Sequence, residues 1–524
     1  MVVDVEKEAA TDGGTHQQSR PIIFDDAEID KMGRIRPEVF RNVWVEIGFC
    51  ICILTSSIVA EFLISGFNVL LPVVIEDLQI DPSKRTWPAN VFALVTGALL
   101  LPFGRLADMY GGYVVFLFGL TWMAVWSLIG GFSINFIMLV MCRALQGIGA
   151  AAFLPAGIML LGSVYRPGPR KNVVFSFYGA CAPFGFFFGI CLAGLSGQYL
   201  TWGWFFWIGT ILLGVVVVGS VFLVPNDRKS PQDIVMDWWG LGSSFAALIL
   251  LVYAFTDSAH YGWKSPQILV TLILGIGLFA GFLYIEAKVA IQPLLPLSLF
   301  QLKYMKSLVF CLFLSYGSFG IYLFYASFYM ETVLHISPLL SAGWFAPLAI
   351  TGIVIGTLGG FVLHRLTGTV MLAISTIGFL ISSLLFALTP DHPSYWAWIL
   401  PAMICASIGI DITFNISNIF ITSNVPADQQ GLAGALINVL LFVGMSIWLG
   451  IADYAVSTDA HLGLKVSYNV GFYLAVAIAG LALLLVLGRI RIGKAKSDLT
   501  VAERDELEQE LLRRRNAGVS KPPK

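Results

Sequence analysis

The stretch that decides the fold is Gly104-Arg105-Leu106-Ala107-Asp108-Met109-Tyr110-Gly111, which lies between two apolar stretches, roughly 88–103 and 112–131. A glycine at each end lets two helices approach closely and lets the chain reverse, because glycine has no side chain. Arg105 and Asp108 are too polar for the hydrocarbon of a bilayer, so they mark a face of the membrane. A short charged turn between two spanning helices favours a transport protein over a simple membrane anchor.

The composition predicts that the chain crosses a membrane many times. Of its 524 residues, 57% are hydrophobic and 12% are charged, whereas soluble proteins carry about 25% charged residues. We therefore expect an all-α integral membrane protein. The formal net charge of -1 offers no basic surface for a nucleic acid, so we expect no nucleic-acid partner.

Residue types that carry metal or nucleotide chemistry are not clustered in this sequence. All seven cysteines fall inside apolar stretches, where a thiol behaves as a small apolar group, and the six histidines fall in tails or loops. The closely spaced Cys50 and Cys52 have no histidine near them. No phosphate-binding loop of the Gly-x-x-x-x-Gly-Lys-Ser/Thr type occurs. We expect no disulfide, no metal site and no cofactor, and we do not expect an enzyme.

Fourteen segments are apolar over a length that can span a bilayer, which takes about 20 residues. They are approximately 47–72, 88–104, 112–131, 136–163, 172–195, 203–224, 238–256, 267–286, 307–330, 341–363, 369–389, 395–421, 431–452 and 468–488. Because this number is even, both termini lie on one side. The connecting loops carry ten Lys and Arg on that side and four on the other, so the positive-inside rule places both termini in the cytoplasm.

Four motifs resemble those of the major facilitator superfamily. Gly104, Asp108 and Gly111 have the spacing of its signature between the second and third helices. The fourth helix carries Arg143-Ala144-Leu145-Gln146-Gly147, which is similar to the family's Arg-x-x-Gln-Gly motif. The remaining two resemble the antiporter motif and the second half of 14-helix drug:proton antiporters: Gly179 to Gly189 with Pro183 and Gly185, and Gly431-Leu432-Ala433-Gly434.

The resemblance covers residues 47–488. It is closest to fungal efflux and resistance transporters of the aminotriazole-resistance type, a branch that also includes low-affinity ammonium transporters. It implies the major facilitator fold, with a substrate path between two six-helix bundles that rock against each other. The implied divisions are a cytoplasmic N-tail, a first bundle, two extra helices with linkers, a second bundle and a cytoplasmic C-tail: 1–46, 47–224, 225–306, 307–488 and 489–524.

One acidic residue lies near the middle of a spanning segment in each predicted bundle. The first helix has a polar face formed by Ser57, Glu61, Ser65 and Asn68. The twelfth has a polar face formed by Ser407, Asp411, Asn415, Asn418 and Thr422. We interpret both faces as the lining of a central cavity, where the two carboxyls exchange protons between the sides of the membrane. The alternative is that these side chains only form hydrogen bonds between helices.

Arg143 is the only basic residue deep in a predicted span, and Gln146 lies three residues later. Arg143 either pairs with a carboxylate and responds to its protonation, or anchors helix packing through backbone carbonyls. The resemblance implies a role in coupling. Tyr316 and Tyr325 on the ninth helix are candidates for stacking on an organic substrate, although tyrosine also occurs at membrane interfaces because it is amphipathic.

The fifth-helix run Gly179, Pro183, Gly185 and Gly189 removes side-chain bulk and one backbone donor. These changes allow close helix packing and a bend. In the family, such a run is linked to antiport rather than uptake.

We therefore predict a proton-coupled exporter of small organic compounds, such as a drug, toxin or secondary metabolite. It acts as a monomer in the plasma membrane, and its partners are the small-molecule substrate, protons and the lipid bilayer. Gly104, Arg105, Asp108 and Gly111 are predicted to gate the cytoplasmic side, with Asp108 facing the start of the helix near Gly431. The alternatives are a transporter of a very small solute such as ammonium and, more distantly, a membrane sensor that does not transport.

Overall fold

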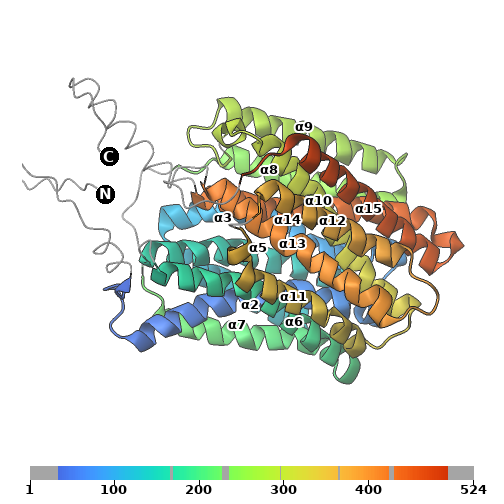
Figure 1. Ribbon diagram of the computed structural model, residues 1–524, viewed down its shortest axis with the longest axis horizontal. Helices are drawn as coiled ribbons and strands as arrows, with labels where there is room; N and C mark the ends of the chain where they lie inside the picture. Colours follow the sequence, from blue (N-terminus) through green and yellow to red (C-terminus); the bar gives the residue numbers. More distant parts are fainter. Residues whose placement is uncertain are drawn as a thin grey trace, which may run out of the picture.

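The computed structural model describes residues 34–165, 169–226, 235–295, 297–363, 366–423 and 430–493. Within these ranges, fourteen helices are long and apolar enough to cross a membrane, which confirms the predicted number. Figure 1 shows them lying side by side along one common direction. Their bounds are α2 Val43–Asp77, α3 Trp87–Tyr110, α4 Gly112–Gly130, α5 Phe136–Val164, α6 Pro169–Tyr199, α7 Gly203–Leu223, α8 Trp238–Tyr261, α9 Pro266–Lys288, α10 Met305–Phe328, α11 Pro338–Leu363, α12 Gly368–Ala387, α13 Leu400–Ser423, α14 Gln430–Thr458 and α15 Leu464–Arg489.

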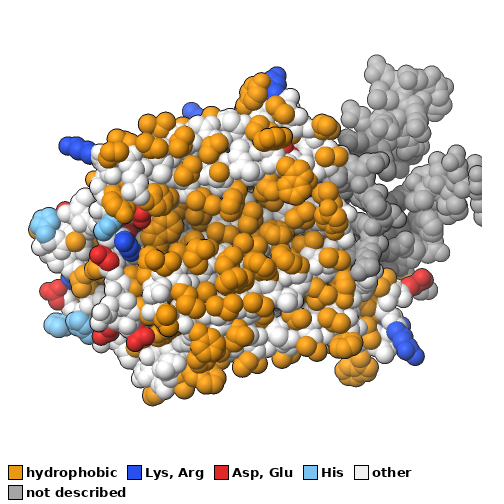
Figure 2. Space-filling model, turned by 180° about the vertical axis from the view of Figure 1, so that it is seen from behind, with side chains coloured by type: hydrophobic (Ala, Val, Ile, Leu, Met, Phe, Trp, Pro, Cys, Tyr) orange, Lys and Arg blue, Asp and Glu red, His pale blue; other side chains and the backbone are white. Residues whose placement is uncertain are grey.

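The surface has the pattern that a bilayer requires. Hydrophobic side chains cover the middle of the face shown in Figure 2, and most charged side chains on that face gather toward the ends of the helices. Many large apolar side chains are exposed along the spans, among them Ile211, Val215 and Phe222 of α7. Lipid tails solvate such a belt, whereas water does not.

Local signals begin and end several of these helices. The side chains of Asn42 and Asn135 accept hydrogen bonds from backbone N–H groups in the first turns of α2 and α5, which otherwise have no partner within the helix. Gly111, Gly262 and Gly463 have φ angles of 95°, 75° and 102°. This left-handed region favours glycine, so these three positions mark sharp changes of chain direction.

The prediction of a turn over the whole of residues 104–111 was wrong. Helix α3 continues to Tyr110, and the chain reverses at Gly111 alone. The physical reason is that a charged segment at the surface of a membrane can be solvated without leaving the helical conformation. Arg105, Leu106, Ala107 and Met109 all favour a helix.

Contacts between helices form two groups with a pair beside them. Helices α2 to α7 pack on one another, chiefly α2 on α6, and α3 and α4 on α5. Helices α10 to α15 form the second group, with α10 packed on α14 and α15, and α12 on α13 and α15. The groups meet where α6 contacts α11 and where α3 contacts α14. Helices α8 and α9 pack on each other, and α8 also contacts α14 and α3.

The helices define two ends of the molecule. We call the end where α2 begins and α15 ends the proximal end. The opposite end, which holds the connection between α2 and α3, is the distal end (Figure 1).

Candidate functional site

Glu61 of α2 and Asp411 of α13 bring one carboxyl from each helix group to the same place. Asp411 acts electrostatically on Glu61. A side-chain carbon added to Gly352 of α11 would lie 2.8 Å from Asp411 Oδ2 and 3.1 Å from Cβ of Pro183 on α6. One added to Gly185 of α6 would lie 3.0 Å from Cβ of Glu61. The two carboxyls therefore flank the seam where α6 meets α11.

The small residues of α6 allow this arrangement. A side chain at Gly185 would come within 2.5 Å of the Ile58 carbonyl oxygen, and one at Gly189 within 2.5 Å of the Phe62 carbonyl oxygen. Both glycines are therefore needed for the close approach of α6 to α2. Gly179 differs, because a side chain there would meet nothing within 4 Å.

An apolar cavity of about 380 Å³ lies on the proximal side of the carboxyls. It is lined by side chains of α2, α6 and α11: Ile51, Leu54, Thr55, Ile58, Phe177, Ala180, Cys181, Phe184 and Ile353. Ile58 is one helical turn before Glu61, and Ile353 follows Gly352, which touches Asp411. Ile51, Phe177 and Phe184 in its wall are exposed, so the cavity is open to the surroundings. It lies next to the two carboxyls, but neither of them lines it. Ligand pockets of roughly this size, about 300–1,000 Å³, bind small organic molecules.

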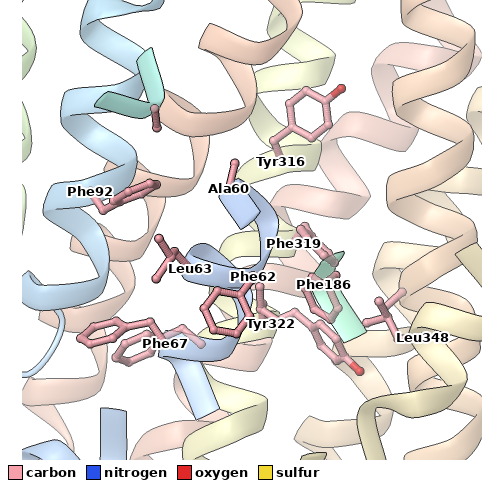
Figure 3. Packing of buried hydrophobic residues seen from close by; sticks show 14 of the residues in the cluster. Ala60, Phe62, Leu63, Phe67, Phe92, Phe186, Tyr316, Phe319, Tyr322 and Leu348 are labelled. Atoms are coloured by element: carbon pink, nitrogen blue, oxygen red, sulfur yellow. The ribbon is translucent and has the colours of Figure 1, made fainter. Parts of the chain in front are cut away.

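Apolar side chains fill the space on the distal side of the carboxyls. Phe186 of α6, Phe319 and Tyr322 of α10, and Leu348 of α11 are each at most 9% exposed. Figure 3 shows these four side chains lying near Phe62 of α2. Phe319 and Tyr322 also pack on the rings of Phe379 and Phe386 in α12. We call the four buried residues Phe186, Phe319, Tyr322 and Leu348 the plug.

Polar contacts close the two helix groups at the distal end. Asp453 of α14 accepts hydrogen bonds from Thr86 Oγ1 at 3.0 Å and from Tyr325 Oη at 3.2 Å. Its Oδ1 forms an ion pair with Arg85, 3.7 Å from Nε, and Arg85 Nη1 donates a hydrogen bond to Tyr468 Oη at 3.1 Å. Arg85 and Thr86 precede α3 in the first group, whereas the other three residues belong to the second. This cluster, the distal latch, holds the groups together.

Arg85 and Asp453 were not predicted to belong to a site. The thirteenth predicted span ended at residue 452, whereas α14 continues to Thr458 and places Asp453 inside the helix. Arg85 was counted only as a loop charge. One feature of the sequence could have identified Asp453: it lies within one helical turn of an apolar span. An acidic side chain is costly in that position unless it has a partner.

Several predicted cavity residues lie away from the carboxyl pair. Tyr325 belongs to the distal latch. The Asn68 carbonyl oxygen accepts from Ser327 Oγ at 3.0 Å, so this part of α2 contacts α10. Ser65 Oγ reaches the Phe186 carbonyl oxygen at 2.9 Å, so helix packing explains this hydroxyl.

The other polar residues of α13 remain close to Asp411 along the helix. Ser407 Oγ donates to Asp411 Oδ2 at 2.7 Å. Asn415 and Asn418 are partly exposed, and Asn418 donates to the Phe414 carbonyl oxygen at 3.0 Å. Tyr316 of α10 is fully buried, facing Gly444 of α14.

Arg143 of α5 is held by backbone carbonyls. Its guanidinium donates to the carbonyl oxygens of Leu63 and Pro88 at 3.1 and 3.2 Å and to Gln146 Oε1 at 3.0 Å. It lies 4.2 Å from the ring centre of Phe67, and only 1% of the residue is exposed. Arg143 thus ties α5 to α2 and α3, as in the packing alternative that the sequence left open.

Replacing Arg143 with alanine should strongly destabilise the first helix group. The substitution removes three hydrogen bonds from a charged donor and leaves an unfilled space where a fully buried side chain stood, which costs about 3 kcal/mol or more. We expect a clear loss of folded protein and a lower melting temperature, measured by size-exclusion chromatography of the heated protein. Arg491→Ala, which removes an exposed guanidinium at the end of the described chain, is the control. Equal melting temperatures for the two variants would contradict this role.

At the proximal end, Arg105 contacts the segments that flank the α8–α9 pair. It donates to the Val235 carbonyl oxygen at 3.4 Å and to Gln292 Oε1. Asp108 lies one turn later on α3. Its predicted partner, the helix start near Gly431, lies outside the residues whose side chains the structure describes. The gating role of Gly104, Arg105, Asp108 and Gly111 stays a prediction.

Comparison with known proteins gives a consistent result. Residues 53–237 and 234–449 match the sequence model of the Major Facilitator Superfamily. The low affinity ammonium transporter of Saccharomyces cerevisiae is 35% identical over 415 residues, which cover 77% of this chain and 80% of that protein. The efflux pump terJ of Aspergillus terreus is 30% identical over 457 residues, covering 84% and 87%. The aminotriazole resistance protein of Saccharomyces cerevisiae is 30% identical over 485 residues, covering 89% of each chain.

These matches confirm the predicted resemblance to fungal efflux and resistance transporters. They extend over both helix groups and over the seams between them. The fourteen apolar helices and the paired helix groups agree with the same assignment. The chain belongs to the major facilitator superfamily and is an integral membrane transporter.

Proposed function

We propose that this protein exports small organic compounds in exchange for protons. The observation that carries the proposal is the placement of Glu61 and Asp411, one from each helix group, on the two sides of the α6–α11 seam and next to an apolar cavity. Ionisable groups at this depth are costly, so they are kept where they bind ions or substrate. A carboxyl that both groups can reach is suited to couple proton binding to their relative movement.

The distribution of charge supports a cytoplasmic proximal end. Ten of the Lys and Arg residues in connecting loops belong to loops on this side, against four on the other. The positive-inside rule then places both termini in the cytoplasm. We assign the protein to the plasma membrane as a monomer.

The direction of transport follows from this orientation. With the proximal end in the cytoplasm, the cavity faces the cytoplasmic side and the distal latch lies on the outer side. Substrate enters from the cytoplasm and occupies the cavity beside the deprotonated carboxyls. The bundles then rock, protons from outside bind Glu61 or Asp411, and substrate leaves. Return to the present conformation releases the protons to the cytoplasm, which completes one exchange.

The size and chemistry of the cavity favour an organic substrate. A volume of about 380 Å³ with an apolar lining exceeds what a single small ion needs. The relatives named as an efflux pump and as a resistance protein agree with this choice. Because one relative is named as a low affinity ammonium transporter, a very small solute is the second candidate substrate.

Transport by purified protein in vesicles tests the proposal. Vesicles with an acidic interior are given a panel of labelled organic compounds or methylammonium. We expect a compound from the panel to accumulate only while the pH gradient lasts, with protons leaving as it enters. Accumulation that ignores the gradient would contradict proton exchange. Accumulation of methylammonium alone would favour the second candidate.

A bulky side chain in the cavity should separate the two candidates further. Ala180→Phe fills part of the cavity on the proximal side of the carboxyls. We expect the KM of an organic substrate to rise about tenfold, because a small steric mismatch in a binding site weakens binding by about this factor. Methylammonium flux should change little. The matched control is Val215→Phe on the lipid-facing side of α7. An unchanged KM for the organic substrate would place its binding site elsewhere.

A further inference from the structure

The extra helix α8 lies along the seam between the two helix groups. It packs on α14 of the second group, where a side chain at Gly450 would come within 2.7 Å of Thr256 Oγ1. The rings of Trp263 and Tyr454 also meet, with 5.7 Å between their centres. Figure 1 shows α8 and α9 along the edge of the molecule beside the second group. These contacts attach α8, and the turn that follows it, to α14.

Polar contacts join α8 to α3 of the first group, and they lie at the distal end. Trp87 Nε1 donates to Asp257 Oδ1 at 2.7 Å, and the Trp87 and Tyr253 ring centres are 6.0 Å apart. A further hydrogen bond of 2.8 Å joins Ser83 Oγ and His260 Nδ1. Asp257 is only 8% exposed, so its bond to Trp87 is well shielded from water.

Asn90 of α3 joins all three helices at one point. Its side-chain amide donates to Thr256 Oγ1 of α8 at 3.2 Å and to the Ser446 carbonyl oxygen of α14 at 3.1 Å. Thr86, one turn earlier, bonds Asp453 of the distal latch. The contacts of α3 with α8 and with α14 therefore form one continuous polar seam.

We propose that α8 is a working part of the distal gate. It moves with α14, while Asp257 and Thr256 hold α3 in the closed conformation and release it when the distal end opens. The apolar contacts with α14 are costly to expose, whereas the few polar groups facing α3 can bond water after separation. This role requires only that the two helix groups move relative to each other. It does not depend on the proposed proton exchange or on the proposed direction of transport.

Amide hydrogen exchange of the full-length protein in lipid nanodiscs tests this role without a substrate. Asp257→Ala removes the acceptor of the Trp87 bond. We expect amides at residues 83–95 and 446–458 to exchange about tenfold faster, because loss of a buried hydrogen bond favours opening. The control is Asp391→Ala, which breaks the exposed Lys465–Asp391 pair at the same end but inside the second group. Faster exchange confined to α8 and α9 would overturn the proposal.

Trp87→Phe provides the same test from the other side of the bond and keeps an aromatic ring against Tyr253. It should speed exchange in the same segments. Asp257→Asn alone, which retains an acceptor oxygen for Trp87, should keep exchange slow. The double variant Trp87→Phe with Asp257→Ala should match Asp257→Ala alone, since both remove one bond. Fully additive effects would overturn the proposal. None of these results depends on whether protons are exchanged.

Discussion

Asp411→Asn is expected to abolish accumulation driven by a pH gradient while leaving substrate exchange across the membrane. Asparagine keeps the shape of Asp411 and a partner for Ser407, but it cannot release a proton. Glu61→Gln should act in the same way, because both carboxyls flank the α6–α11 seam. We expect at least about a tenfold loss of gradient-driven accumulation, equivalent to 1.4 kcal/mol of coupling free energy.

The vesicle assay measures this effect, with exchange of labelled for unlabelled substrate as the companion measurement. Asp391→Asn is the matched control, since this carboxyl lies on the surface at the distal end with a side-chain exposure of 85%. If only one of the two variants loses accumulation, the proton is carried by that residue. Normal accumulation by both variants would refute the proton role of the pair.

Asp453→Ala is expected to open the distal end of the protein. The substitution leaves Arg85 in a buried site without its acid and removes the acceptor of Thr86 and Tyr325. Breaking a buried ion pair from one side costs about 3–5 kcal/mol. If that cost falls on the closed conformation alone, the ratio of open to closed forms rises by more than about a hundredfold.

Reaction of a cysteine introduced as Ser327→Cys reports this opening. Ser327 is fully buried at the distal contact with Asn68, so a membrane-impermeant thiol reagent should label it only when that contact separates. Labelling without the introduced cysteine corrects for the seven native thiols.

A paired replacement separates opening from general damage to the fold. Arg85→Met with Asp453→Leu exchanges the ion pair for apolar side chains of similar volume, which is often neutral for stability. The double variant should therefore return to slow labelling. Rapid labelling of the Asp391→Ala control, or slow labelling of Asp453→Ala, would show that the latch does not hold the distal end closed.

The placement of individual polar residues shows where sequence reasoning reached its limit. Ser65 lies one turn after Glu61, and periodicity puts both on one face of α2. In the structure both residues face α6: Ser65 bonds the Phe186 carbonyl oxygen, and Glu61 packs beside Gly185. Helical spacing fixes the direction of a side chain, but it does not say whether a cavity or a neighbouring helix lies there. Arg143 had the same ambiguity, and its carbonyl partners became visible only after α2, α3 and α5 were packed.

The sequence by itself determined the membrane class, the fourteen spans and the family. Each of these depends on local properties, because a bilayer demands about 20 apolar residues per span and the motifs are short. Tertiary structure alone decided which polar groups meet. Thr86 and Asp453 are 367 residues apart in the chain, and they bond because α3 and α14 pack across the two groups. The cavity, the plug and the distal latch exist only in that packing, because each is formed by residues from at least three different helices or their flanking segments.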